Sequence, residues 1–195
     1  MPRIGVLALQ GDVAEHMAML SRSGAEAVPV KTEKAFRHVD GLVIPGGEST
    51  TIGKLLRRFD LIEPIQERVH NGFPVYGTCA GMILLADEVE DAGVDQPTLG
   101  GMRITVQRNA FGRQRESFET DLTVPALGDA PLHAVFIRAP LITRADAGVN
   151  LLATLEDGRP VAARQDNLLV SSFHPELTDD DRMHRYFVRM VEDQA

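Results

Sequence analysis

Short apolar runs alternate with amphipathic stretches through the first half of the 195-residue chain. The apolar runs are rich in β-branched residues, which favour strands, whereas the amphipathic stretches repeat apolar residues at helical spacing. This alternation is typical of βαβ units, in which parallel strands form a sheet that helices cover. Four strands are expected, at residues 4–9, 27–30, 40–45 and 73–76.

Polar residues at the ends of the amphipathic stretches predict where the helices begin. Asp12 follows the first strand and can cap a helix, with Glu15 three residues later completing a capping box. Ser49 or Thr50 can cap a second helix after the third strand. A final helix is expected to start with the acidic run 179–181, because carboxylates are favourable at the positive end of a helix dipole.

The pattern changes between residues 97 and 170, where strand-like runs are separated by turns rich in Gly, Asp, Asn and Pro. These runs predict an antiparallel or mixed extension of the sheet, at residues 102–107, 134–137, 151–155, 161–164 and 168–173. The expected fold class is therefore α/β, with three layers, a mostly parallel central sheet and helices on both faces. The length fits a single domain over residues 1–195.

Composition narrows the class of protein. The chain is 44% hydrophobic and 25% charged, which is typical of a soluble globular protein, and no apolar stretch approaches the roughly 20 residues of a membrane span. The net charge is −8 and no basic cluster is interleaved with aromatics, which argues against a nucleic-acid partner. A single cysteine cannot form an internal disulfide, so a reducing compartment, the cytoplasm, is expected.

That cysteine, Cys79, lies in the segment Gly77-Thr78-Cys79-Ala80-Gly81, between the fourth expected strand and a helical run that starts at Met82. This is the sequence form of a nucleophile elbow, a sharp strand-to-helix turn that leaves the central side chain exposed. The helix N-terminus would favour a thiolate, the reactive form of the side chain. The alternative is a buried structural cysteine, but the flanking glycines favour the elbow.

A candidate base and carboxylate come much later, in Phe173-His174-Pro175-Glu176. Because Pro175 opposes a helix, an extended chain would place the side chains of His174 and Glu176 on the same side. The carboxylate could then orient the imidazole, which would exchange protons with a thiol. The alternative is a strand-end histidine beside a solvated glutamate; together with Cys79, a Cys-His-Glu hydrolase is favoured. Three other histidines are expected on helix surfaces: His16, His70 and His184.

A glycine-rich loop, 46–50, follows the third strand and opens a helix, so its backbone amides can bind an anion. It does not match a nucleotide-binding phosphate loop, because Gly47 and Gly53 are one residue too far apart and Leu55 follows Lys54 where Ser or Thr is required. An oxyanion donor from Gly47 is the preferred interpretation, with a plain turn as the alternative.

Two arginines, Arg108 and Arg138, lie in loops or at strand ends, where a guanidinium can bind a carboxylate. Surface arginines are usually only solvated, so this sign is weak by itself. No Cys, His and carboxylate cluster shows metal-ligand spacing, so no metal is expected.

The elbow and the His174–Glu176 motif resemble the class I, or triad, glutamine amidotransferases. More narrowly, four segments resemble the glutaminase subunit of pyridoxal 5'-phosphate synthase, and the similarity runs nearly from end to end. These segments are residues 5–12, 45–51, 108–114 and 172–178. The resemblance implies a flavodoxin-like fold of the kind found in that family.

The resemblance also implies hydrolysis of L-glutamine to glutamate and ammonia through a glutamyl thioester on Cys79. His174 would shuttle protons, Glu176 would orient His174, and the amides of Gly47 and Ala80 would hold the oxyanion. No cofactor is implied. By the same resemblance, the residues that bind glutamine would be Gly47, Glu48, Ser49, Arg108, Ile137 and Arg138.

Ammonia would pass to a synthase subunit that makes pyridoxal 5'-phosphate from ribose 5-phosphate and glyceraldehyde 3-phosphate. In such proteins the glutaminase docks on a large ring-shaped synthase assembly and is weakly active until it does. We hypothesise that docking rearranges the turn at 9–11 or the loop at Gly46 and Gly47. Two alternatives remain open: another triad amidotransferase or γ-glutamyl hydrolase, and a non-catalytic binding or thiol-sensing module with the same fold.

Overall fold

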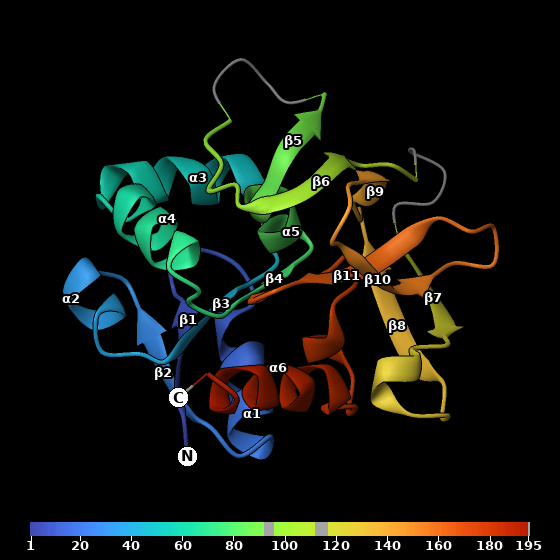
Figure 1. Ribbon diagram of the computed structural model, residues 1–195, viewed down its shortest axis with the longest axis horizontal. Helices are drawn as coiled ribbons and strands as arrows, with labels where there is room; N and C mark the ends of the chain where they lie inside the picture. Colours follow the sequence, from blue (N-terminus) through green and yellow to red (C-terminus); the bar gives the residue numbers. More distant parts are fainter. Residues whose placement is uncertain (92–95, 112–116, 195) are drawn as a thin grey trace.

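A seven-stranded sheet forms the centre of the computed structural model, which describes residues 1–91, 96–111 and 117–194 (Figure 1). The strand order is β10-β11-β12-β4-β3-β1-β2. The five strands from β12 to β2 are parallel, whereas β10 and β11 continue the sheet in antiparallel pairing. The bounds are β1 (Arg3–Leu7), β2 (Glu26–Val30), β3 (Gly41–Ile44), β4 (Val75–Thr78), β10 (Asn150–Thr154), β11 (Pro160–Gln165) and β12 (Leu168–Ser171).

Helices cover both faces of this sheet (Figure 1). Helices α1 and α6 lie on one face, and α3, α4 and α5 lie on the other. None of the helices in the described residues is long and apolar enough to cross a membrane. The bounds are α1 (Val13–Arg22), α2 (Glu33–Phe36), α3 (Ser49–Arg58), α4 (Ile62–His70), α5 (Ala80–Leu85) and α6 (Arg182–Glu192), with 3-10 turns η1 (Pro125–Leu127) and η2 (Pro175–Leu177).

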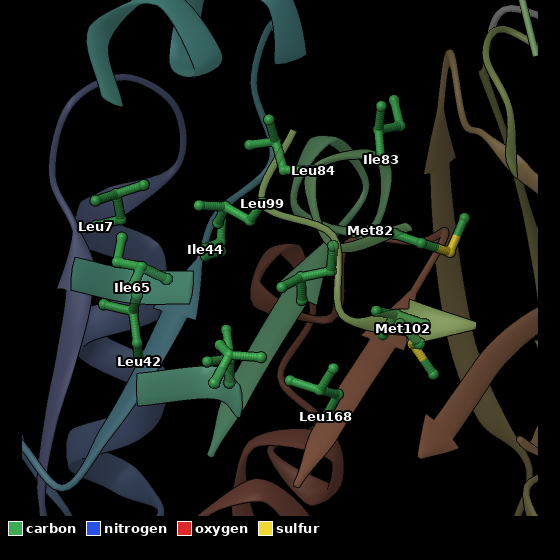
Figure 2. Close-up of a cluster of buried hydrophobic side chains, with 14 of the residues drawn as sticks. Leu7, Leu42, Ile44, Ile65, Met82, Ile83, Leu84, Leu99, Met102 and Leu168 are labelled. Atoms are coloured by element: carbon green, nitrogen blue, oxygen red, sulfur yellow. The ribbon is translucent and has the colours of Figure 1, made fainter. Parts of the chain in front are cut away.

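The alternation of side chains along β3 separates two hydrophobic cores. Leu42 and Ile44 point to the core beneath α3, α4 and α5, where Ile65 and Leu84 pack with them (Figure 2). Val43, between them in the strand, belongs to the core beneath α1 and α6. Because successive residues of a strand face opposite sides, a fully apolar strand requires cover on both faces. The predicted three-layer α/β fold with a mostly parallel sheet is therefore confirmed.

The expected extension of the sheet is only partly correct. Strands β10 and β11 do extend it, but residues 102–107 and 134–137 belong to two smaller sheets, β5-β6-β9 and β7-β8. In the second of these sheets the rings of Phe118 and Phe136 stack with centroids 4.5 Å apart. The additional bounds are β5 (Ala86–Glu90), β6 (Met102–Gln107), β7 (Ser117–Leu122), β8 (Leu132–Ile137) and β9 (Leu141–Ala145).

The predicted helix starts are right in position but wrong in detail. Glu48, rather than Ser49 or Thr50, caps α3, and its carboxylate accepts hydrogen bonds from the amides of Thr50 and Thr51. A glutamate one residue earlier can reach both amides, and its negative charge is favourable at the helix N-terminus. Asp12 is the residue before α1, but its side chain makes no capping hydrogen bond.

The carboxyl ends of the parallel strands bring the predicted site residues to one edge of the sheet. The loop after β3 carries Gly47, the turn after β4 carries Cys79, and the segment after β12 carries His174. Ligands of open α/β sheets bind outside this edge, because the loops there converge. The fold therefore places three distant segments around one position.

Two glycines allow α5 to lie close to the strands beneath it. A Cβ atom added to Gly81 would lie 2.3 Å from the carbonyl oxygen of Ile44, and one added to Gly77 would lie 2.5 Å from the carbonyl oxygen of Gly81. Both contacts are with backbone, which cannot rotate away as a side chain can. The approach of α5, and with it the position of the preceding Cys79, depends on these glycines.

Gly81→Ala is expected to lower the free energy of unfolding by roughly 1–3 kcal/mol, because the methyl group overpacks the contact with β3. Alanine in place of glycine normally stabilises a helix by up to about 1 kcal/mol, so a net loss isolates the clash. Urea denaturation followed by circular dichroism measures the change. Unaltered or increased stability would show that α5 can move away from β3 freely.

Candidate active site

Cys79 occupies a strained turn between the last residue of β4 and the first residue of α5. Its φ is 48° and its ψ is −100°, values that are uncommon outside glycine and cost on the order of 1–3 kcal/mol. The amide of Cys79 donates a hydrogen bond to the carbonyl oxygen of Ser171, at 2.8 Å, which ties the turn to the end of β12. This backbone has the geometry of a nucleophile elbow.

His174 and Glu176 form the expected pair, although the local structure differs from the prediction. The Nδ1 atom of His174 lies 2.7 Å from Oε1 of Glu176, and both side chains are buried. The chain here is not extended: Pro175 opens the 3-10 turn η2, with Glu176 inside it. Proline has no backbone N–H, but the first N–H groups of a helix have no partner within the helix. Proline can therefore begin such a turn.

Cys79 and His174 line one cavity of about 360 Å³. Burial by itself lowers the pKa of His174, but the adjacent Cys79 and Glu176 side chains outweigh it and raise the pKa to about 10. The Nε2 atom of His174 has no hydrogen-bond partner among the described residues, while Nδ1 is held by Glu176. The imidazole is therefore oriented by the carboxylate and can exchange a proton through Nε2.

Asp12 adds a second carboxylate to His174, with Oδ2 at 3.5 Å from Nδ1. Sequence reasoning did not predict this contact. Ligand atoms of Asp12, His174 and Glu176 lie within 4.8 Å of one another, as in a possible metal site. However, Nδ1 of His174 already makes a short hydrogen bond to Glu176. We interpret the group as an oriented imidazole, and the absence of a metal stays a prediction.

Gly47 and Ala80, the predicted oxyanion donors, both line the cavity. Their role stays a prediction. The side chain of Gln10 lies against the same loop, since its Oε1 accepts a hydrogen bond from the amide of Glu48 at 2.8 Å. A Cβ atom added to Gly47 would lie 2.4 Å from that oxygen. The side-chain carbonyl of Gln10 is thus hydrogen-bonded to the Glu48 amide, a backbone donor beside the predicted oxyanion position.

The structure brings the other predicted glutamine-binding residues to this cavity: Glu48, Ser49, Arg108, Ile137 and Arg138. Arg108 lies 3.6 Å from the carboxylate of Glu48 and donates a hydrogen bond to Oε1 of Gln96 at 2.9 Å. The carbonyl oxygen of Ile137 is 3.8 Å from the sulfur of Cys79. Arg138 forms no ion pair within the described part of the chain, which leaves its guanidinium available for a ligand.

Sequence reasoning did not assign five further residues that line the cavity. Gln10, Asp12 and Asn109 lie within segments that carry the family resemblance, so those segments could have indicated them. Leu177 is apolar but also lies in such a segment, 172–178, whereas Ile83 is an apolar residue outside all four. The full additional set is Gln10, Asp12, Ile83, Asn109 and Leu177. Residues 112–114, the end of one resembling segment, lie outside the described residues.

The prediction that His16 and His184 lie on helix surfaces was wrong, whereas His70 is exposed as predicted. His16 and His184 are fully buried where α1 and α6 meet. Nδ1 of His16 lies 2.9 Å from Nε2 of His184. His16 precedes the buried Met19 and Leu20 by three and four residues, which places all three on one helix face. That spacing was the sign that sequence reasoning missed.

Residues 6–193 match the sequence model of the SNO glutamine amidotransferase family. The chain belongs to this family. A curated relative from Parafrankia sp., called pyridoxal 5'-phosphate synthase subunit PdxT, is 58% identical over 190 residues, or 97% of this chain and 93% of the relative. A protein of the same name from Herpetosiphon aurantiacus is 59% identical over 186 residues, or 95% of this chain and 98% of the relative.

Solved structures agree with this family membership. A crystal structure described as a glutamine amidotransferase matches with a TM-score of 0.90 and 50% identity, covering 97% of this chain and 98% of the other. PurLQS from Thermotoga maritima matches with a TM-score of 0.70 but only 15% identity, over 99% of this chain and 98% of the other. The second match supports the fold alone.

Cys79→Ala is expected to lower the pKa of His174 from about 10 by roughly one unit or more, because the sulfur that favours the imidazolium is removed while burial remains. Histidine ring NMR across a pH titration measures the change. His133 is the control, since its hydrogen bonds to Asp121 and then Glu119 raise its pKa at an exposed site. An unchanged His174 titration would contradict a Cys79–His174 interaction.

Arg138→Ala is expected to raise KM for glutamine roughly 10- to 100-fold and to alter kcat little, because a charged hydrogen-bond donor to the substrate is lost. Steady-state measurements of glutamate release over a range of glutamine concentrations test this. Arg144→Ala is the matched control, because Arg144 is exposed on β9 and pairs with Asp146 and Glu88 away from the cavity. Equal KM values for the two variants would exclude Arg138 from substrate binding.

Proposed function

We propose that this chain is the glutaminase subunit of a pyridoxal 5'-phosphate synthase, in which it hydrolyses L-glutamine to L-glutamate and ammonia. One observation carries the chemistry: a cysteine in an elbow turn lines the same cavity as an imidazole that a buried carboxylate orients. The family membership and the names of the relatives supply the substrate and the pathway. The whole chain of 195 residues forms one glutaminase domain in this proposal.

The reaction begins with attack of the Cys79 thiolate on the side-chain amide carbon of glutamine. The amides of Gly47 and Ala80 stabilise the oxyanion of the tetrahedral intermediate, because fixed donors act strongly where water is excluded. The His174 imidazolium then gives its proton to the leaving nitrogen, and ammonia departs as the thioester forms. Neutral His174 next takes a proton from water, which attacks the thioester and releases glutamate.

The charged ends of glutamine fit the polar side chains around the cavity. The guanidinium groups of Arg138 and Arg108 can bind the α-carboxylate, and the carboxylate of Glu48 can bind the α-ammonium group. Ser49 and the backbone of Ile137 complete the proposed set. This arrangement holds the side-chain amide toward Cys79, since the opposite end of the substrate is fixed.

Ammonia released into water is protonated to ammonium, which has no free lone pair and is not a nucleophile. Its chemistry therefore favours direct transfer to the synthase subunit within a large hetero-oligomeric complex. The side-chain oxygen of Gln10 accepts a hydrogen bond from the amide of Glu48, the residue after the predicted oxyanion donor Gly47. We propose that docking of the synthase moves this turn and completes the oxyanion hole. A cytoplasmic location belongs to the same proposal.

Cys79→Ala is expected to reduce glutamate release by about a thousandfold or more in the presence of the synthase subunit, because the nucleophile is absent. A coupled glutamate dehydrogenase assay measures the rate, and unfolding curves show whether the variant remains folded. Arg144→Ala serves as the control, since Arg144 is exposed and outside the cavity.

The same assay separates the alternatives. A thiol-sensing module would release no glutamate in either the native or the variant chain. Another amidotransferase or a γ-glutamyl hydrolase would release glutamate or cleave its own substrate without any response to the synthase subunit. Equal rates for the native chain and Cys79→Ala would exclude Cys79 as the nucleophile.

A further inference from the structure

A chain of buried polar groups continues behind Glu176, on the side away from the cavity. The Nε2 atom of His16 lies 3.4 Å from Oε2 of Glu176, and both side chains are fully buried. The same Nε2 atom lies 3.0 Å from Oγ1 of Thr78, the residue before Cys79. On its other side, Nδ1 of His16 lies 2.9 Å from Nε2 of His184.

Burial favours the neutral form of both histidines. Burial lowers the pKa of His16 well below its ordinary value, and the nearby His184 and then His174 lower it further. Burial likewise lowers the pKa of His184 to about 4, against a small opposing effect of Asp181. Each ring therefore carries one proton, and the position of that proton decides what His16 can donate.

Counting unpaired atoms identifies the tautomer of His16. Oε2 of Glu176 is buried and makes no hydrogen bond to a described residue, and Nε2 of His16 lies 3.4 Å from it. If the proton is on Nε2 of His16, that N–H can donate to Oγ1 of Thr78 and lies beside Oε2 of Glu176, while Nδ1 accepts a hydrogen bond from His184. On His184 only a lone pair, on Nδ1, is then unpaired.

The other tautomer leaves a buried N–H without an acceptor. With the proton on Nδ1, His16 donates to His184, so the N–H on Nδ1 of His184 is buried without an acceptor. A lone pair on Nε2 of His16 also faces the carboxylate of Glu176. Since an unmatched buried donor is costly and a lone pair that faces a carboxylate is repelled, the proton belongs on Nε2.

We propose that His16 is a positioning residue for the catalytic groups: its Nε2–H holds the outer oxygen of Glu176 so that the inner oxygen stays on His174. His184 fixes the tautomer that makes this possible. The carboxylate is thereby held from both sides, by His174 at 2.7 Å and by His16 at 3.4 Å. Because His16 also contacts Thr78, one side chain locates both the carboxylate and the strand that carries Cys79.

This inference deepens the proposed function, and a matched pair of variants tests it. In His16→Gln the amide nitrogen reaches the position of Nε2, whereas in His16→Asn it reaches only that of Nδ1. We expect kcat for glutamine, measured with the synthase subunit, to stay within about threefold for His16→Gln and to fall about tenfold or more for His16→Asn. KM should change less than about twofold in both, because His16 does not line the cavity.

Alkylation of Cys79 by iodoacetamide provides a readout without glutamine or a partner, because the chain contains no other cysteine. At pH 7 we expect His16→Asn to react roughly fivefold to tenfold more slowly than the native chain and His16→Gln to react at a similar rate. His70→Gln, at an exposed position on α4, is the control. If the native chain releases no glutamate, the proposed function fails while the alkylation rates still test His16.

A measurement on the native chain is independent of whether the variants fold. The nitrogen chemical shifts of His16 distinguish a proton on Nε2 from one on Nδ1, and we expect the former. Equal kcat values and equal alkylation rates for the Gln and Asn variants would overturn the proposal. So would a proton on Nδ1, because His16 could not then donate to Glu176.

Discussion

The parallel pairing of β12 with β4 is the constraint on which the site depends. In its register Ser171 lies beside Thr78, so the chain leaves the sheet at the same level in both strands. Cys79 directly follows Thr78 at the end of β4, and His174 lies three residues after Ser171, which ends β12. The hydrogen bond from the Cys79 amide to the Ser171 carbonyl oxygen then fixes the strained elbow against its neighbour. A one-residue slip would reverse the faces of the strand and separate these groups.

Burial gives the site both its reactivity and its need for a complete set of partners. Glu176 is almost fully buried, and burial raises its pKa, while the hydrogen bond to His174 opposes that effect. A buried carboxylate that lacks donors is costly, so the groups around it must be matched. His174 meets this need on one side, and in our proposal His16 meets it on the other. The interior between α1 and α6 is therefore part of the site, although it lies behind the cavity.

Local sequence signals predicted the features that local chemistry determines. Alternating apolar runs indicated the parallel sheet, and glycines around Cys79 indicated the turn. The sequence did not predict which later strands join that sheet, because strand pairing depends on partners far apart in the chain. It also failed for His16 and for Glu48, since an amphipathic pattern says which face is buried but not which polar group is paired there. The sharp 3-10 turn at Pro175 was missed because proline was taken only as a helix breaker.

The turn after β1 lies against the loop that carries Gly47, the predicted oxyanion donor. A Cβ atom on Gly11 would lie 1.7 Å from the carbonyl oxygen of Gly46, so the two turns are in backbone contact. The amide of Asp12 also donates to that oxygen, at 3.3 Å, and the Asp12 carboxylate faces His174. With Gln10 bound to the Glu48 amide, three successive residues of one turn touch the groups that would bind the oxyanion and move the proton. A partner that displaces this turn would therefore act on both at once, which links docking to chemistry through short contacts alone.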